Sequence, residues 1–198
     1  INSGPGSYNV SEETRAGWIN TSATWYAFQG ESGLNRTFYF TNNMMHGNAT
    51  RTQGFWATHT NRTQNVVRDN LSGYIYIGTP SGHHKNITTY EQLFGAFWSN
   101  IAYMSNGTRR SSVDQARMIL VQQLVAAILN EAAFGTPAVD LSTSEDLIAA
   151  GNNAFGGDNR TEMLRVAGLL DAYNQSGDDE PLPSWMEPPG PATPRLSQ

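Results

Sequence analysis

The fold is decided by residues 112–137, which read SVDQARMILVQQLVAAILNEAAFGTP. Ser112 opens a capping-box pattern, which is a signal for the start of a helix. Apolar residues at helical spacing follow as far as Phe134, where Gly135 and a nearby proline indicate the end of the helix. The apolar stripe comprises Val113, Ala116, Leu120, Leu124, Ala127 and Ile128. We therefore expect one long helix whose apolar side lies in the core.

The same signals predict shorter helices on both sides of this segment. Ser142, with a glutamate three residues later, is expected to open a helix that Gly151 stops. Asn159 is expected to open another that ends near Gly177, and if it carried a glycan it would have to cap this helix differently. Residues 91–104 are apolar and aromatic at helical spacing. This spacing predicts a further helix there. The helices expected from Ser112, Ser142 and Asn159 together make residues 108–177 the helical half of the protein.

The preceding residues, 15–107, are aromatic, rich in threonine and interrupted by turn signals. Alternation over residues 22–29, a glycine-containing turn and the aromatic residues 38–40 predict a β-hairpin. Residues 74–77 predict another short strand. The expected fold class is α+β, with a β-containing N-terminal half packed on the helical half in one globular domain over residues 15–178.

Both ends of the chain lack the periodicity of a helix or a strand. Residues 1–14 are rich in Gly, Pro and Ser, and residues 179–198 contain six of the nine prolines. We expect extended arms, which gain order only by lying on another surface, most naturally that of an identical subunit. The parent domain is the alternative surface. The residues expected to anchor the C-terminal arm are Leu182, Trp185 and Met186.

Composition argues against several classes of function. The net charge is −5, which does not suit a general nucleic-acid binder, and there is no cysteine for disulfides or thiolate metal sites. No apolar run is expected to span a membrane. No known catalytic or phosphate-binding motif occurs, so we expect no enzymatic activity, cofactor or metal. His83 and His84 are adjacent, and we interpret them as an exposed loop rather than metal ligands.

Asparagine acceptor motifs for N-glycosylation are unusually frequent. Ten of the 18 asparagines begin Asn-x-Ser/Thr, against about three expected by chance. The acceptors are Asn9, Asn20, Asn35, Asn48, Asn61, Asn70, Asn86, Asn106, Asn159 and Asn174. None lies between Asn106 and Asn159, where the most apolar helix is expected. This pattern predicts a secreted or cell-surface glycoprotein that carries N-linked glycans, from an archaeal or eukaryotic source more readily than a bacterial one.

Three segments carry a resemblance to a known family. Residues 51–60, RTQGFWATHT, resemble the T-x-G-F/Y-W-K-x-H motif of a family of secreted, largely uncharacterised archaeal and bacterial surface proteins. Residues 120–130, LVQQLVAAILN, are similar to its Q-L-x-A-A-x-L-N helix, and residues 167–177, AGLLDAYNQSG, to its L-L-D-x-Y-N-N-G end. Ala57 departs from the usual lysine. The resemblance implies an exported surface protein and supplies no activity.

The motif residues suggest a structural link between this segment and the helices. Large aromatic side chains such as Trp56 bury extensive area, and His59 has a backbone carbonyl, Asn130 or Tyr173 as possible hydrogen-bond partners. A ligand or metal site is the less favoured alternative. The residues expected in this link are Gly54, Phe55, Trp56, His59, Asn130 and Tyr173.

Two functions follow as hypotheses. The first is a structural subunit of an extracellular homopolymer, a filament, tube or sheath, assembled when the arm of one subunit docks on the next. The second is a monomeric surface module that binds carbohydrate or another surface. The aromatic residues considered for that binding are Trp18, Trp25, Tyr26 and Trp56.

Overall fold

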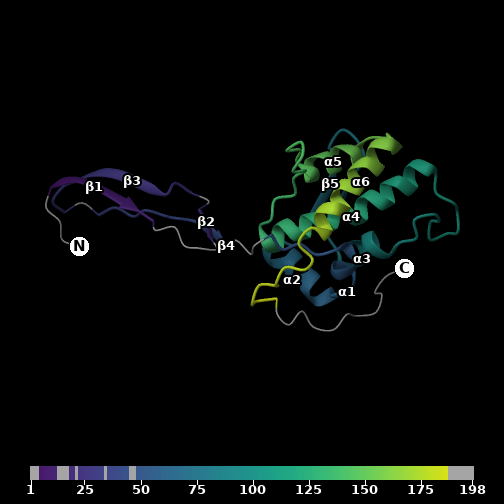
Figure 1. Ribbon diagram of the computed structural model, residues 1–198, viewed down its shortest axis with the longest axis horizontal. Helices are drawn as coiled ribbons and strands as arrows, with labels where there is room; N and C mark the ends of the chain where they lie inside the picture. Colours follow the sequence, from purple (N-terminus) through teal and green to yellow (C-terminus); the bar gives the residue numbers. More distant parts are fainter. Residues whose placement is uncertain (1–4, 13–17, 21, 34, 45–47, 187–198) are drawn as a thin grey trace. The chain divides into compact units, whose positions relative to one another are not determined.

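A computed structural model describes residues 5–12, 18–20, 22–33, 35–44 and 48–186 (Figure 1). Strands lie mainly toward the N-terminus and helices mainly toward the C-terminus, which confirms the α+β class. The chain divides into two compact units, residues 1–45 and residues 46–198. This division differs from the single globular domain expected over residues 15–178, because the first strands pair with one another.

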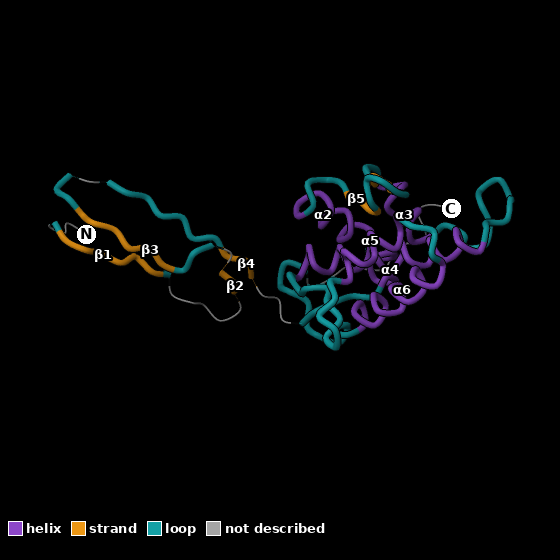
Figure 2. The backbone as a smooth tube through the Cα atoms, turned by 90° about the horizontal axis from the view of Figure 1, so that it is seen from above, coloured by secondary structure: helices purple, strands orange, loops and turns teal. Residues whose placement is uncertain are grey.

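The larger unit is organised around α4, Ser112–Phe134. In the described part of the chain, α4 contacts all five other helices. Figure 2 shows the helices of this unit from above. Leu120, Leu124 and Leu129 are fully buried along it. The N-cap is Ser111, whose hydroxyl accepts from the Asp114 N–H, one residue earlier than the capping box predicted. At the other end Gly135 adopts a φ of 68°, which suits glycine.

Two helices pack on α4 from the C-terminal side of the sequence. α5 covers Leu147–Gly156 and α6 covers Arg160–Gln175. Asp146 caps α5, so the helix begins after the predicted Ser142, and it continues through Gly151. A Cβ atom at Gly151 would lie 2.7 Å from the Leu124 side chain. This glycine therefore allows close packing on α4 rather than stopping the helix.

Three further helices lie in the region expected to be rich in strands. They are α1 at Gln53–Thr58, α2 at Thr60–Asn70 and α3 at Tyr90–Trp98, and α3 confirms the helix predicted within residues 91–104. Helix α2 was not predicted, because its buried face includes the polar residues Thr60 and Thr63 beside Val66 and Val67. One two-stranded antiparallel sheet joins these helices, with β5 at Ile75–Gly78 paired to β6 at His84–Ile87.

The smaller unit contains two antiparallel strand pairs. β1, Gly6–Ser11, pairs with β3, Trp25–Gly30, and β2, Trp18–Asn20, pairs with β4, Asn42–Met44. The predicted hairpin, in which residues 22–29 would pair with residues 38–40, is wrong. Strand β3 pairs with β1 instead. Residues 5–12 of the expected N-terminal arm therefore do not form a separate arm. The remaining residues of that arm lie outside the described part.

One face of the β1–β3 pair is aromatic. Tyr8 stands opposite Phe28 in the register, and their ring centroids are 5.6 Å apart. The row continues with centroid distances of 5.1 Å from Phe28 to Phe38 and 5.2 Å from Phe38 to Tyr26. We call Tyr8, Tyr26, Phe28, Phe38 and Phe40 the aromatic face. Each of the five is half-buried, and no described residue of the smaller unit is fully buried.

The described part of the C-terminal arm lies on its own domain. Met186 is fully buried in the core of the larger unit, and Leu182 packs against that core. The backbone carbonyl of Trp185 accepts from Arg62 Nη1 at 3.3 Å, while its indole stays 41% exposed. The expectation that a neighbouring subunit orders these anchors is corrected for residues 179–186. Residues 187–198 lie outside the described part.

Helix α4 is long and apolar enough to cross a membrane by length and composition alone. No apolar run of this length was expected from the sequence, and in length and composition that expectation is wrong. More than half of the apolar stretch is buried inside the domain, as in the central helix of a folded core.

The burial of Met186 predicts that the C-terminal segment stabilises the larger unit. Replacing Met186 with alanine should lower the free energy of unfolding by about 2–5 kcal/mol, because it leaves a cavity in the core. Met104→Ala is the matched control, since that side chain is 39% exposed and should change stability little. Denaturant unfolding measures both, and equal midpoints would contradict this packing.

Candidate functional site: a buried amide network and the sequon asparagines

Residues 51–60, which we call the tryptophan motif, contain α1 and the first residue of α2, and the two helices are separated at His59. Thr52 caps α1 by accepting from the Phe55 N–H, and the backbone leaves helical geometry at His59 before α2 begins. The imidazole stacks on the Phe55 ring with centroids 4.2 Å apart, and its Nδ1 lies 3.0 Å from the Phe55 carbonyl oxygen. Of the partners considered for His59, the structure shows the backbone carbonyl.

Trp56 links this motif to the central helix α4. The indole is fully buried, and its Nε1–H donates to Asn130 Oδ1 at 2.9 Å. Its ring also lies beside Phe134, with centroids 5.9 Å apart. The buried tryptophan therefore has a partner for its one polar atom, as burial requires. Gly54 lies in the first turn of α1 and has no direct part in this contact.

The Asn130 side chain makes four hydrogen bonds. Its Oδ1 also accepts from the Arg51 N–H at 2.8 Å. Its Nδ2 donates to the Arg51 carbonyl at 2.9 Å and to Asn174 Oδ1 at 2.9 Å. Both amide donors and both oxygen lone pairs are thus used. A buried network in which every member is satisfied fixes one arrangement of its elements.

Asn174 extends the network to α6. Its Nδ2 donates to the backbone carbonyl of Gln123 at 3.0 Å and to Gln123 Oε1 at 2.9 Å. The residue is fully buried. A glycan attached at Nδ2 would have to occupy space that the core fills, so Asn174 is not a usable acceptor in the folded domain. The prediction of glycosylation at Asn174 is therefore corrected.

Arg51, which the motif did not single out, holds the start of the C-terminal segment. Its guanidinium donates to the carbonyl oxygens of Gly177 at 2.9 Å and Glu180 at 2.6 Å. The charge lies about 6 Å from the centres of the Phe55 and Phe134 rings. Arginine can serve several carbonyls at once because it carries five N–H donors. Only its position next to the motif could have suggested it.

Gly177 and Tyr173 complete the join between the chain segments. The Thr50 N–H donates to the Gly177 carbonyl at 3.2 Å, and a Cβ atom on Gly177 would collide with the Asn48 carbonyl. The Tyr173 hydroxyl donates to the Thr136 carbonyl at 2.7 Å. Burial, together with the nearby Glu131 carboxylate, raises the pKa of Tyr173. This phenol is a structural donor, not a proton acceptor at neutral pH.

Most of the other acceptor asparagines lie on the surface. The exposed ones are Asn9, Asn35, Asn48, Asn61, Asn70, Asn86, Asn106 and Asn159. The side chain of Asn20 lies outside the described part. Asn159 caps α6 through Oδ1, which leaves Nδ2 outside the capping bond, so a glycan there need not disturb the cap. Exposure is compatible with glycosylation, which stays a prediction.

The histidine pair and the acidic residues form no evident metal centre in the described residues. His83 Nε2 lies 3.2 Å from Asp158, while His84 Nδ1 lies 3.1 Å from the Gly82 carbonyl. No group of three or more His, Asp or Glu side chains is close enough to hold a metal within the ranges that the structure describes. The buried network is thus the best-defined constellation, and its groups hold the fold together.

Removing the donors of Asn130 should destabilise the larger unit. Asn130→Asp keeps the shape but leaves the Arg51 carbonyl and Asn174 Oδ1 without a donor, so unfolding free energy should fall by about 2–5 kcal/mol. The control is Asn153→Asp on the exposed side of α5, expected within about 0.5 kcal/mol of wild type. Denaturant unfolding distinguishes them, and a neutral Asn130→Asp would refute the network's role.

Glycopeptide mass spectrometry of native material should separate the two acceptors of α6. We expect glycan at Asn159, which is exposed at the helix start, and bare peptide at Asn174, which is buried near its end. The shared helix makes them an internal control for accessibility. A modified Asn174 would show that the acceptor is used before the core closes, and a mass equal to the bare polypeptide would refute the glycoprotein prediction.

No family model, curated protein or solved structure matches this chain. The resemblance of residues 51–177 to a family of exported surface proteins therefore stays a prediction.

Proposed function

We propose that the chain is the repeating structural subunit of an extracellular, N-glycosylated polymer, and that it has no catalytic role. One observation carries this proposal: the aromatic face of residues 5–44 is only half-buried, and nothing described in this unit is fully buried. A two-stranded sheet is marginally stable in water on its own. A contiguous apolar face of this kind is typical of a contact surface.

An identical subunit could pair with the open edge of β1 as well as cover the aromatic face. In the described part of the chain, β1 forms a ladder with β3 alone. Its other edge presents backbone N–H and C=O groups that an incoming strand would pair. An edge on one copy that meets a different surface on the next makes a heterologous contact. Such a contact builds an open helical assembly when its rotation does not close a ring.

The position of the first acceptor asparagine also favours this arrangement. Asn9 is exposed and lies in register with Ala27, on the side of the β1–β3 pair opposite the aromatic face. Ser7 and Gln29 share that side, where Gln29 Nε2 donates to the Ser7 hydroxyl at 2.8 Å. A glycan on Asn9 would therefore leave the aromatic face open to another copy and would cover the polar face.

In this proposal the N-terminal unit, and not the two arms, supplies the contact between subunits. Leu182 and Met186 contact their own domain, so residues 179–186 supply stability instead of a bond between subunits. The alternative function is a monomeric carbohydrate-binding module. Trp56 is not available to bind a carbohydrate in it, because its side chain is fully buried. Trp25 is 60% exposed and Tyr26 belongs to the aromatic face, while the Trp18 side chain lies outside the described part.

Assembly should depend on the aromatic face and not on the polar face of the same strand. Phe28→Glu places a charge on the aromatic face and should leave monomers, whereas the control Gln29→Glu lies on the opposite side and should still polymerise. Negative-stain microscopy and sedimentation velocity measure assembly. Circular dichroism checks that the larger unit stays folded.

Two outcomes would refute the proposal. One is a wild-type glycoprotein that stays monomeric at every concentration tested. The other is a Phe28→Glu variant that polymerises as the wild type does.

A further inference from the structure

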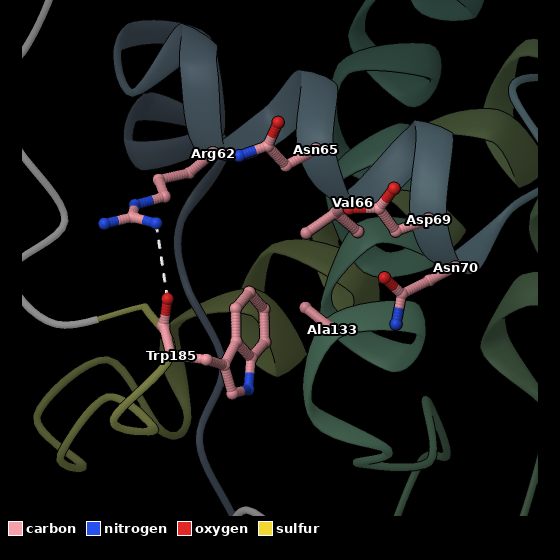
Figure 3. Close-up of a pocket in the computed structure, with 7 residues that line it drawn as sticks. All are labelled: Arg62, Asn65, Val66, Asp69, Asn70, Ala133 and Trp185. Atoms are coloured by element: carbon pink, nitrogen blue, oxygen red, sulfur yellow. Dashed lines mark hydrogen bonds between the residues drawn. The ribbon is translucent and has the colours of Figure 1, made fainter.

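A pocket of about 380 Å³ lies between α2, the end of α4 and the C-terminal segment (Figure 3). Its volume falls in the range of small-molecule sites, roughly 300–1,000 Å³. Figure 3 shows the Trp185 indole across the pocket from α2. The lining residues are Arg62, Asn65, Val66, Asp69, Asn70 and Ala133, together with Trp185.

The polar groups of this pocket come mainly from one face of α2. Arg62, Asn65 and Asp69 are spaced by three and four residues, so they lie along one side of the helix. Asn70 follows at the end of the helix, and its Nδ2 donates to the Ala132 carbonyl at 2.9 Å. A guanidinium, a carboxylate and two amides therefore line the same pocket as one half-exposed indole.

The backbone that carries the Trp185 indole is anchored to the domain. Arg62 Nη1 donates to the Trp185 carbonyl, and the next residue, Met186, is fully buried and donates its N–H to the Pro183 carbonyl at 2.8 Å. A buried anchor on one side of an exposed aromatic ring restricts the ring's backbone. Such preorganisation lowers the entropy lost when a ligand stacks on the ring.

The carboxylate is also fixed in its charged form. Arg68 binds both Asp69 oxygens, from Nε at 2.6 Å and from Nη2 at 2.7 Å. This hydrogen bonding lowers the pKa of Asp69. Asp69 therefore stays an acceptor at neutral pH, with lone pairs that the bidentate pair does not use.

We propose that this pocket binds a saccharide ring, with one C–H face stacked on Trp185 and the hydroxyls hydrogen-bonded to Asp69, Asn65 and Arg62. A pyranose has an apolar face and a rim of hydroxyl groups that both donate and accept. An indole bordered by planar polar side chains matches both features. A flat apolar aromatic ligand would stack on the indole equally well but would make no hydrogen bonds with the polar groups on α2.

Two sources would supply the same chemistry. Asn70 lines the pocket and Asn61 lies on the same helix, so a glycan attached to α2 is one source. That source rests on the proposed glycosylation. A free sugar, or a glycan carried by another molecule, is the other source, and it does not depend on whether this chain is glycosylated.

The test begins with the full chain produced without glycans. Glucose, galactose, mannose, N-acetylglucosamine and glucuronic acid are titrated separately, with indole N–H resonances followed by NMR. At least one sugar should shift the Trp185 signal, and Trp185→Ala should weaken its binding about tenfold or more. Trp25→Ala, which removes a 60% exposed indole elsewhere, should bind as wild type does.

Asn65→Ala is a second test variant, needed because Trp185→Ala could weaken binding by disturbing the fold. It removes one polar contact from an exposed helix face and should weaken binding while the unfolding midpoint stays unchanged. The proposal is overturned if none of the five sugars binds the glycan-free chain. It is also overturned if binding survives unchanged in both Trp185→Ala and Asn65→Ala.

Native glycoprotein then distinguishes the sources. If the glycan on Asn70 fills the pocket, free sugar should bind only after enzymatic deglycosylation or in Asn70→Gln. If the sugar comes from elsewhere, native and deglycosylated protein should bind with equal affinity, and either result supports the pocket. Native protein that carries no glycan would refute the glycoprotein proposal, while the glycan-free titration still decides the saccharide site.

Discussion

The larger unit depends on one side-chain amide whose hydrogen bonds are all made. Asn130 joins Trp56, the backbone of Arg51 and, through Asn174, the helix α6. Because each bond is buried, a shift of any one element would leave a polar group unpaired. Apolar packing on α4 supplies most of the stability of such a core. The amide selects which packed arrangement forms.

A second feature of the same region is the fastening of the C-terminal segment. Arg51 follows directly on the stretch that enters the larger unit, and its guanidinium holds the carbonyls of Gly177 and Glu180. The segment then runs on to Met186 in the core. This anchoring also fixes Trp185, so the proposed saccharide pocket depends on the core. Arg51 and residues 177–186 of the larger unit therefore stabilise each other.

Sequence reasoning succeeded where local patterns decide the structure. The stripe from Val113 to Ile128 predicted α4, and Asn159 was correctly identified as the cap of α6. It failed where distant contacts decide. The polar appearance of α2 conceals Thr63, whose hydroxyl donates to the Trp56 carbonyl within the core. The partner of β3 lies before it in the chain, so the local turn at residues 30–33 misled the hairpin prediction.

The candidate sites show the same limit. Trp56 and Asn130 were both singled out, and the structure joins them, but the contribution of Arg51 follows only from where the chain returns. An Asn-x-Ser/Thr motif describes three residues and says nothing of burial, which is why Asn174 and Asn159 could not be distinguished. Trp185 and Met186 are neighbours with opposite exposures, and composition alone treats them as equal anchors.

The alternation along β1 constrains how this segment can change. Tyr8 and Asn9 point to opposite sides because successive strand residues alternate. If Gly6 kept its pairing with Gly30, one inserted residue between Gly6 and Tyr8 would exchange the two sides of the remaining register and carry Asn9 to the side of the aromatic rings. Point substitutions alter single contacts and leave this division intact. Over evolution, β1 should therefore tolerate replacement of its residues far better than any change in its length.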